Sequence, residues 1–140
     1  MSKIAVVYWS GTGNTESMAE AVLEGAKGAG AEAEIFKAAE FDTSTVGNYD
    51  AIAFGCPSMG SEQLEEDEFE PMFKECEGSL SGKKVGLFGS YGWGDGEWMR
   101  NWEETCLGDG AVMPAEFVIC NDAPDDDALE ACRNLGAALN

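Results

Sequence analysis

The stretch Ile4-Ala5-Val6-Val7-Tyr8-Trp9-Ser10-Gly11-Thr12-Gly13-Asn14-Thr15 decides the fold that this sequence predicts. Its first half, residues 4–9, is continuously apolar, as expected of a parallel strand that is covered on both faces. After residue 15, small and apolar residues recur at helical spacing, at Met18, Val22, Gly25, Ala26 and Ala29. The polar residues 10–15 are therefore expected to connect a buried strand to the start of a helix.

This connection has the composition of a phosphate-binding loop without a cation. Its glycines let the backbone turn sharply and approach a ligand, and its hydroxyls, its amide and the unpaired N–H groups of the helix start supply donors. It has no Lys, so it is not a nucleoside-triphosphate loop, and Glu16 stands where the dinucleotide fingerprint needs its third glycine. We predict a site for a terminal phosphate monoester, with an ordinary helix-capping turn as the alternative.

Composition and charge limit the class of protein. The chain has 140 residues, the size of one domain spanning residues 1–140. With 8 basic and 27 acidic residues, no His and a net charge of −19, nucleic acid and anionic membranes are not expected as partners. Partners with basic docking faces are expected instead, although solubility alone would also explain the charge.

The cysteines and the N-terminus indicate a compartment. The count of five cysteines is odd, their spacing is wide, and no C-x-x-C motif is present, which favours reduced thiols. The apolar run near the N-terminus is too short for a signal peptide, and no run reaches membrane-spanning length. We therefore expect a cytoplasmic monomer without a metal site.

Strand-like and helix-like segments alternate along the chain. Further strands are predicted at residues 33–36, 51–56, 85–89 and 117–120, and helices from about residue 14 to 28 or 30, over 69–76, after residue 96 and over 128–139. Residues 41–48 are expected to be irregular. This alternation predicts an α/β fold with three layers, α/β/α, and a five-stranded parallel sheet in the order 2-1-3-4-5.

Ligands of such sheets bind beyond the carboxyl ends of the strands, here at the predicted loops 10–15, 57–62, 90–96 and 121–127. Trp93 lies between glycines, where it either stacks on a planar ligand or folds onto the surface. Trp98 and Trp102 have helix-core spacing, whereas Trp9 suits either the core or the edge of a ligand. Met59 and Gly60 offer an apolar contact and a backbone joint, or form a plain turn.

Three segments together resemble the short-chain flavodoxins of anaerobic bacteria: residues 8–16 (YWSGTGNTE), 55–62 (GCPSMGSE) and 87–96 (LFGSYGWGDG). The resemblance runs from the first strand to the last helix in order and spacing. It implies a flavodoxin-like fold, non-covalently bound flavin mononucleotide (FMN) and one-electron transfer between protein partners.

The resemblance also implies roles for individual residues. Trp93 and Met59 would cover the outer and inner faces of the flavin ring, and Glu62 would accept the N3 hydrogen. The Gly60–Ser61 peptide would flip on reduction, and position 61 is Ser where some relatives carry Asp. The phosphate would be held by Ser10, Gly11, Thr12, Gly13, Asn14 and Thr15. Further contacts to the phosphate, the ribityl chain or the ring edge would come from Ser58, Ser90, Tyr91, Gly92, Gly96 and Asn121.

The expected function is that of a low-potential one-electron carrier rather than an enzyme. It would cycle mainly between the neutral semiquinone and anionic hydroquinone of FMN and shuttle electrons between redox enzymes in place of ferredoxin. Carboxylates near the expected ring should disfavour the anion and lower the second potential: Glu62, Glu65, Glu66, Asp67, Glu68, Glu70 and Asp95.

Other classes fit less well. A small FMN-dependent quinone or NAD(P)H reductase is the alternative, but no stretch resembles a nicotinamide site and the acids would repel an anionic dinucleotide. A phosphotransfer receiver would need acids where residues 9–10 and 56–57 stand. Residues 125–127 lack the glycine and the distal Glu of a calcium loop.

Overall fold

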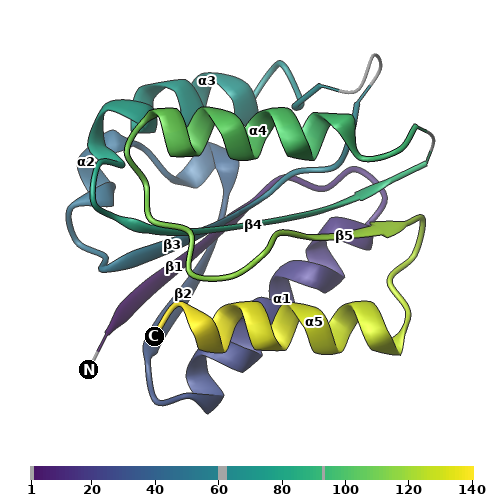
Figure 1. Ribbon diagram of the computed structural model, residues 1–140, viewed down its shortest axis with the longest axis horizontal. Helices are drawn as coiled ribbons and strands as arrows, with labels where there is room; N and C mark the ends of the chain where they lie inside the picture. The colour runs from purple at the N-terminus through teal and green to yellow at the C-terminus, as the bar shows by residue number, and fades with distance from the viewer. Residues whose placement is uncertain (1, 60–62, 93) are drawn as a thin grey trace.

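The computed structural model describes residues 2–59, 63–92 and 94–140, and its centre is a five-stranded sheet with the order β2-β1-β3-β4-β5 (Figure 1). Each neighbouring pair of strands is parallel. The predicted fold class and strand order are confirmed. The strands are β1 (Lys3–Tyr8), β2 (Glu32–Lys37), β3 (Ala51–Gly55), β4 (Lys84–Tyr91) and β5 (Val118–Asn121).

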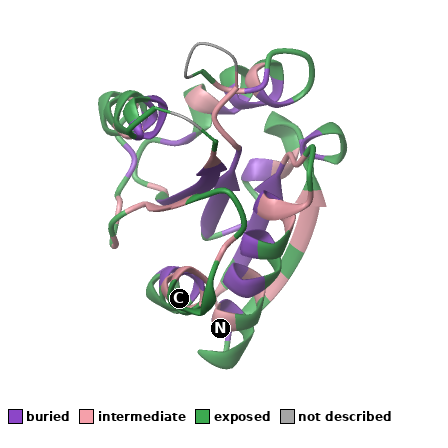
Figure 2. Cartoon of the chain, turned by 90° about the vertical axis from the view of Figure 1, so that its right-hand side faces the viewer, coloured by how far each residue is buried: buried purple, intermediate pink, exposed green. Residues whose placement is uncertain are grey.

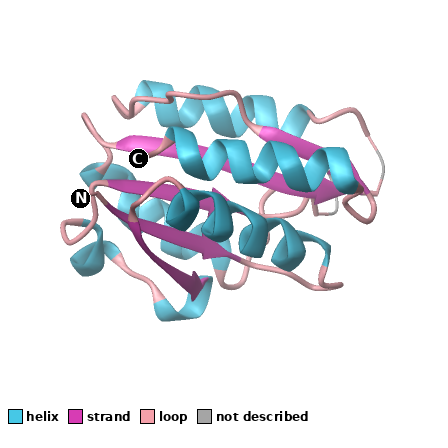
Figure 3. Ribbon diagram, turned by 90° about the horizontal axis from the view of Figure 1, so that it is seen from below, coloured by secondary structure: helices cyan, strands magenta, loops and turns pink. Residues whose placement is uncertain are grey.

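Helices cover both faces of the sheet. On one face lie α1 (Asn14–Gly28) and α5 (Asp126–Ala138), which run side by side in Figures 1 and 3. Their backbones meet at glycines: a Cβ on Gly25 would lie 1.9 Å from the carbonyl oxygen of Arg133, and one on Gly136 would lie 2.1 Å from that of Val22. The other face carries α3 (Phe69–Cys76), α4 (Glu97–Gly108) and the short α2 (Thr43–Val46). Single 3₁₀ turns follow β2 and α3, at Ala38–Glu40 and Glu77–Ser79.

The core consists of two apolar clusters, one on each face of the sheet. Alternate residues of β1 point to opposite faces, so Val6 packs under α1 and Val7 packs under α3 and α4. Figure 2 shows the buried residues concentrated in the strands and on the sheet-facing sides of the helices. Trp98 and Trp102 are only 2% and 3% exposed, which confirms their predicted place in the helix core.

The cysteines contribute packing rather than cross-links. All five are free, and Cys56 is fully buried, as its position at the end of an apolar run predicts. Burial raises the pKa of the Cys56 thiol, so this side chain stays neutral. No helix of the described chain combines the length and apolar character that a membrane span requires.

Residues 41–48 are not irregular as expected, because they contain α2. The carboxylate of Asp42 accepts hydrogen bonds from the hydroxyl and N–H of Ser44 and from the hydroxyl of Thr45, and these bonds lower the pKa of Asp42. This N-cap stabilises a helix of four residues, which is too short to show a periodic pattern.

Several element boundaries also differ from expectation. Strand β4 continues through Ser90 and Tyr91, which were expected in a loop, because they pair with Cys120 and Asn121 of β5. Asn121 likewise ends a strand rather than starting a loop. Helix α5 begins at Asp126 instead of residue 128, with Asp125 as a cap that accepts the N–H of Ala128 at 2.8 Å.

Two carboxyl groups meet where α3 and α4 end. Burial, and then the hydrogen bond to Asp109 and its negative charge, raise the pKa of Glu77 to about 7, with Lys74 opposing the shift. The Oδ2 atom of Asp109 is buried and receives no hydrogen bond from a fixed donor among the described residues. A protonated Glu77 can donate the hydrogen bond that this carboxylate oxygen lacks.

This pair makes stability depend on pH. The folded pKa of Glu77, about 7, lies above the ordinary value of 4.5, so the folded state binds more protons between these values. The resulting stability is present below about pH 4.5 and is lost as the pH rises through about 7. We expect Glu77→Gln, whose amide donates to Asp109 at every pH, to flatten the dependence of the unfolding free energy on pH between about 5 and 8.

Urea unfolding of the wild type, Glu77→Gln and Glu75→Gln over this range measures the effect. Glu75 is an exposed carboxylate near the end of α3 and serves as the matched control. If the unfolding free energies of wild type and Glu77→Gln change with pH in parallel, this would contradict a hydrogen bond from protonated Glu77 to Asp109.

Candidate functional site

A cavity of about 250 Å³ opens at the carboxyl ends of the strands. Its walls come from the residues after β1, the start of α1, the segment after β3 and the end of β4, so it lies at the predicted switch point. None of the described residues that line it is Lys or Arg. The lining consists of Trp9, Ser10, Gly11, Thr12, Asn14, Thr15, Pro57, Ser58, Met59, Ser90, Tyr91, Gly92 and Asp122.

The loop between β1 and α1 gathers backbone donors at one point. Gly13, the N-cap of α1, has a φ of 97°, in the left-handed region that favours glycine. The Oγ atom of Ser10 accepts the N–H groups of Gly13 at 3.1 Å and Glu16 at 3.3 Å. Amides that converge on one small acceptor at a helix N-terminus also suit a phosphate oxygen, so the loop fits an anion without a cation.

Thr15 and Ser90 meet beside this loop. Thr15 is 1% exposed, and its Oγ1 lies 3.2 Å from the Oγ of Ser90, whose N–H also donates to Thr15 Oγ1 at 3.4 Å. These contacts join the first turn of α1 to the end of β4. The two hydroxyls line the cavity, and their role as phosphate or ribityl donors stays a prediction.

The segment after β3 brings Ser58 and Met59 into the cavity wall. The N–H of Ser58 donates to the carbonyl oxygen of Ser90 at 3.0 Å. Met59 and Gln63 exchange two backbone hydrogen bonds, of 2.9 and 3.0 Å, which fix them against each other. The predicted contacts of Gly60, Ser61, Glu62 and Trp93 lie outside the described residues and stay predictions.

Three predicted residues do not line this cavity. Gly13 faces a second cavity on the other side of the loop. Gly96 is the N-cap of α4 with a φ of 92°, and a Cβ there would lie 2.9 Å from the Cδ1 atom of Ile119, so conformation and packing explain this glycine. Asn121 pairs with Tyr91 in the sheet.

Sequence reasoning missed Asp122 as a cavity residue. Its N–H donates to the carbonyl oxygen of Tyr91 at 2.8 Å, and its φ of 58° is left-handed, a conformation that Asp tolerates better than most residues. In the sequence it is one of several acids in a polar stretch, and nothing distinguishes it from the others.

The acids that follow Met59 have different roles. Glu65 is 6% exposed, and its carboxylate accepts the N–H groups of Asp67, Glu68 and Phe69 at 2.8 to 2.9 Å, which caps α3. Burial raises the pKa of Glu65, but these three donors outweigh it and leave the pKa lowered. Glu65 is therefore a structural carboxylate, unlike the exposed Glu66 and Asp67.

The fold and the cavity define a class: doubly wound α/β proteins that hold a phosphate-bearing ligand at the switch point. Comparison with known proteins identifies the family. The family model described as Flavodoxin matches residues 6–136. The chain belongs to the flavodoxin family.

Similar proteins cover nearly the whole chain. It is 44% identical over 135 residues to flavodoxin from Megasphaera elsdenii and 45% identical over 134 residues to that from Clostridium beijerinckii, with 96% of each chain covered. The solution structure of the two-electron reduced M. elsdenii flavodoxin matches with a TM-score of 0.89 and 46% identity, covering 97% of both chains. Flavodoxins are electron carriers that bind FMN, so the cofactor of this chain is FMN and its partners are redox proteins.

The left-handed Gly13 offers a direct test of the loop. A side chain there has open space but must adopt a left-handed backbone, which costs about 1–2 kcal/mol. We expect Gly13→Ala to distort the convergent N–H groups and weaken FMN binding by roughly tenfold, a factor that corresponds to 1.4 kcal/mol. Quenching of flavin fluorescence in a titration measures this affinity.

Gly28→Ala is the matched control, because a Cβ on Gly28 also meets nothing within 4 Å and its φ is not left-handed. Equal FMN affinity of the two variants would argue against phosphate binding by the N–H groups of this loop.

Proposed function

We propose that the chain is a low-potential one-electron carrier that holds FMN non-covalently, uses mainly its semiquinone/hydroquinone couple and transfers electrons between redox enzymes in place of ferredoxin. One observation supports this proposal most strongly. None of the described residues that line the cavity is Lys or Arg, and the segment beside the cavity is acidic. Ser10, Thr12, Asn14 and the loop backbone would hold the phosphate. Met59 and Tyr91 would contact the rest of the cofactor.

The charges near the cavity support the low potential. Bound FMN supplies the one-electron chemistry, and the protein sets how costly an added negative charge is. A carboxylate at about 10 Å disfavours an anion by ~0.4 kcal/mol in water, and by more in a lower dielectric. Exposed carboxylates on the segment after Met59 therefore all disfavour an added negative charge on the cofactor, and no cation of the described cavity lining opposes them.

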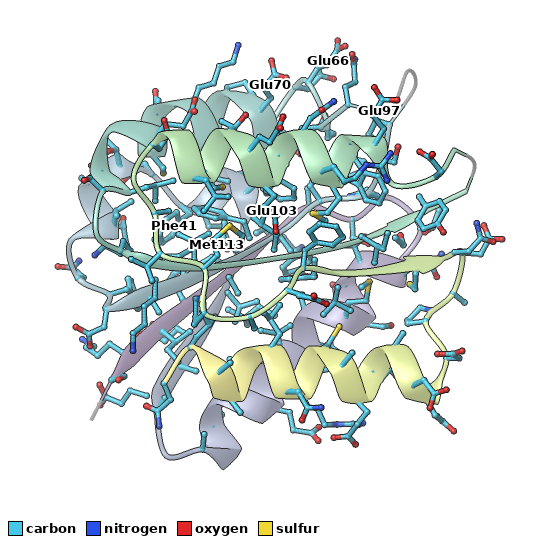
Figure 4. The ribbon with its side chains drawn as sticks, viewed as in Figure 1. Phe41, Glu66, Glu70, Glu97, Glu103 and Met113 are labelled. Atoms are coloured by element: carbon cyan, nitrogen blue, oxygen red, sulfur yellow. The ribbon has the colours of Figure 1, made fainter. Side chains whose placement is uncertain are left out.

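The same charges support a role as a carrier with protein partners rather than as an enzyme. Carboxylates extend along α3 and α4, and Figure 4 shows Glu66 and Glu70 pointing away from the sheet. A basic docking face on the partner would match this surface, and association would weaken with added salt. We further propose that the chain acts as a cytoplasmic monomer.

An anaerobic reductive titration followed by absorbance tests the function. The yellow FMN-loaded protein should turn blue partway through the titration and then pale. The purified protein should not sustain NAD(P)H oxidation with a quinone. Direct bleaching without the blue stage would contradict the proposed couple, and steady turnover would favour a reductase.

A charge-removal variant tests the electrostatic part. Glu66→Gln with Asp67→Asn removes two exposed carboxylates and keeps the Glu65 cap, so the second potential should rise by roughly 35 mV at low salt and by less at high salt. Potentiometry of the FMN-loaded protein measures this shift.

Glu32→Gln with Glu75→Gln removes the same charge from the amino-terminal edge of the sheet, where β2 begins and α3 ends. A shift of equal size in this control pair would show that net charge, and not the charge near the cavity, sets the potential.

A further inference from the structure

Trp9 separates two cavities. It follows β1, and its N–H donates to the carbonyl oxygen of Gly55 at 3.0 Å, so its backbone stays in the sheet. Its side chain lines the FMN cavity and also a second cavity of about 620 Å³ on the other side of the loop. Residues 10–12 line both cavities as well. Trp9 and this part of the loop therefore form the wall between them.

The indole lies directly against the loop. A Cβ added to Gly11 would lie 3.1 Å from Cη2 and 3.3 Å from Cζ3 of the Trp9 ring. The ring thus occupies the space that a side chain at position 11 would need. Any displacement of the indole would remove the support beneath Gly11 and allow the loop to move.

One hydrogen bond orients the indole. Its Nε1–H donates to Oε1 of Glu68 at 3.0 Å. Glu68 is itself held, because its N–H donates to the buried carboxylate of Glu65 at 2.8 Å. The N–H of Glu65 lies 3.4 Å from the Sγ of Cys56, the residue after β3. A chain of contacts therefore links the end of β3 to the phosphate loop through Glu68 and Trp9.

We propose that Glu68 is a positioning residue for the cofactor phosphate: by holding the Trp9 indole, it fixes the loop of residues 10–13 in the shape that receives the phosphate. This inference rests on the binding of FMN in the cavity described above. The carboxylate does not itself touch the phosphate. It acts through the ring that packs under Gly11.

Electrostatics alone predicts the opposite effect of removing Glu68. A carboxylate near a phosphate repels it, so a purely electrostatic role means that every neutral variant binds FMN more tightly. Positioning requires an acceptor for the indole N–H, whatever its charge. Glu68→Gln keeps an acceptor oxygen and loses the charge, whereas Glu68→Ala loses both.

The experiment compares affinities for FMN and for riboflavin, which lacks the phosphate. We expect Glu68→Ala to bind FMN about fivefold more weakly, the effect of one lost hydrogen bond, and to bind riboflavin almost unchanged. Glu68→Gln should bind FMN as tightly as the wild type or more tightly. Glu68→Ala introduced into Trp9→Phe, which has no indole N–H, should not weaken FMN binding further.

A second readout needs no cofactor. In the FMN-free protein, the indole N–H resonance of Trp9 should shift in Glu68→Ala and stay near its wild-type position in Glu68→Gln. An unshifted resonance, or FMN binding by Glu68→Ala as tight as wild type, would overturn the positioning role alone. A wild-type chain that binds neither FMN nor riboflavin would instead overturn the assignment of the cavity and, with it, this inference.

Discussion

The structure depends on satisfying the backbone N–H groups at the start of α1 without a cation. A helix N-terminus leaves its first N–H groups unpaired, and a positive partial charge accumulates there. In this protein the N–H groups of Gly13 and Glu16 converge on the hydroxyl of Ser10. The geometry of residues 10–16 therefore determines whether a phosphate can be bound by hydrogen bonds and the dipole alone.

Such a site works only if its donors are held still, since none of the described residues that line the cavity is a lysine that could follow the ligand. The fold holds both ends of the loop. Strand β1 is paired on both edges, with β2 and β3, and α1 is in backbone contact with α5 at Gly25 and Gly136. The Thr15–Ser90 contact adds a third attachment, to the end of β4. We therefore expect the rigidity of the core to contribute to the affinity of the loop for the FMN phosphate.

The sequence predicts the parts of this arrangement that depend on periodic burial. A continuous apolar run such as residues 4–9 favours a strand covered on both faces, and alternation with helices then leaves few topologies. The sequence does not predict features that depend on a single hydrogen bond. Asp42 stabilises a helix too short for a pattern, and Ser90 and Tyr91 are polar or aromatic yet continue a strand because β5 pairs with them. The roles of Glu65 and Asp122 could not be distinguished from those of neighbouring acids, since composition does not specify which N–H a carboxylate meets.

Because many of these acids have structural partners, the formal charge of −19 overstates the negative field near the cavity. Asp42, Glu65 and Asp125 are helix caps, Asp95 pairs with Arg100, and burial together with Asp109 raises the pKa of Glu77 to about 7. These groups stabilise structure first, and their negative charge is offset by N–H dipoles, a cation or a proton. On the proposed function, the field that an added electron meets would come mainly from carboxylates near the cavity that have no such structural role. In the proposed electron carrier, the distribution of donors around each acid, rather than the number of acids, would therefore set how strongly the protein opposes a second negative charge on its cofactor.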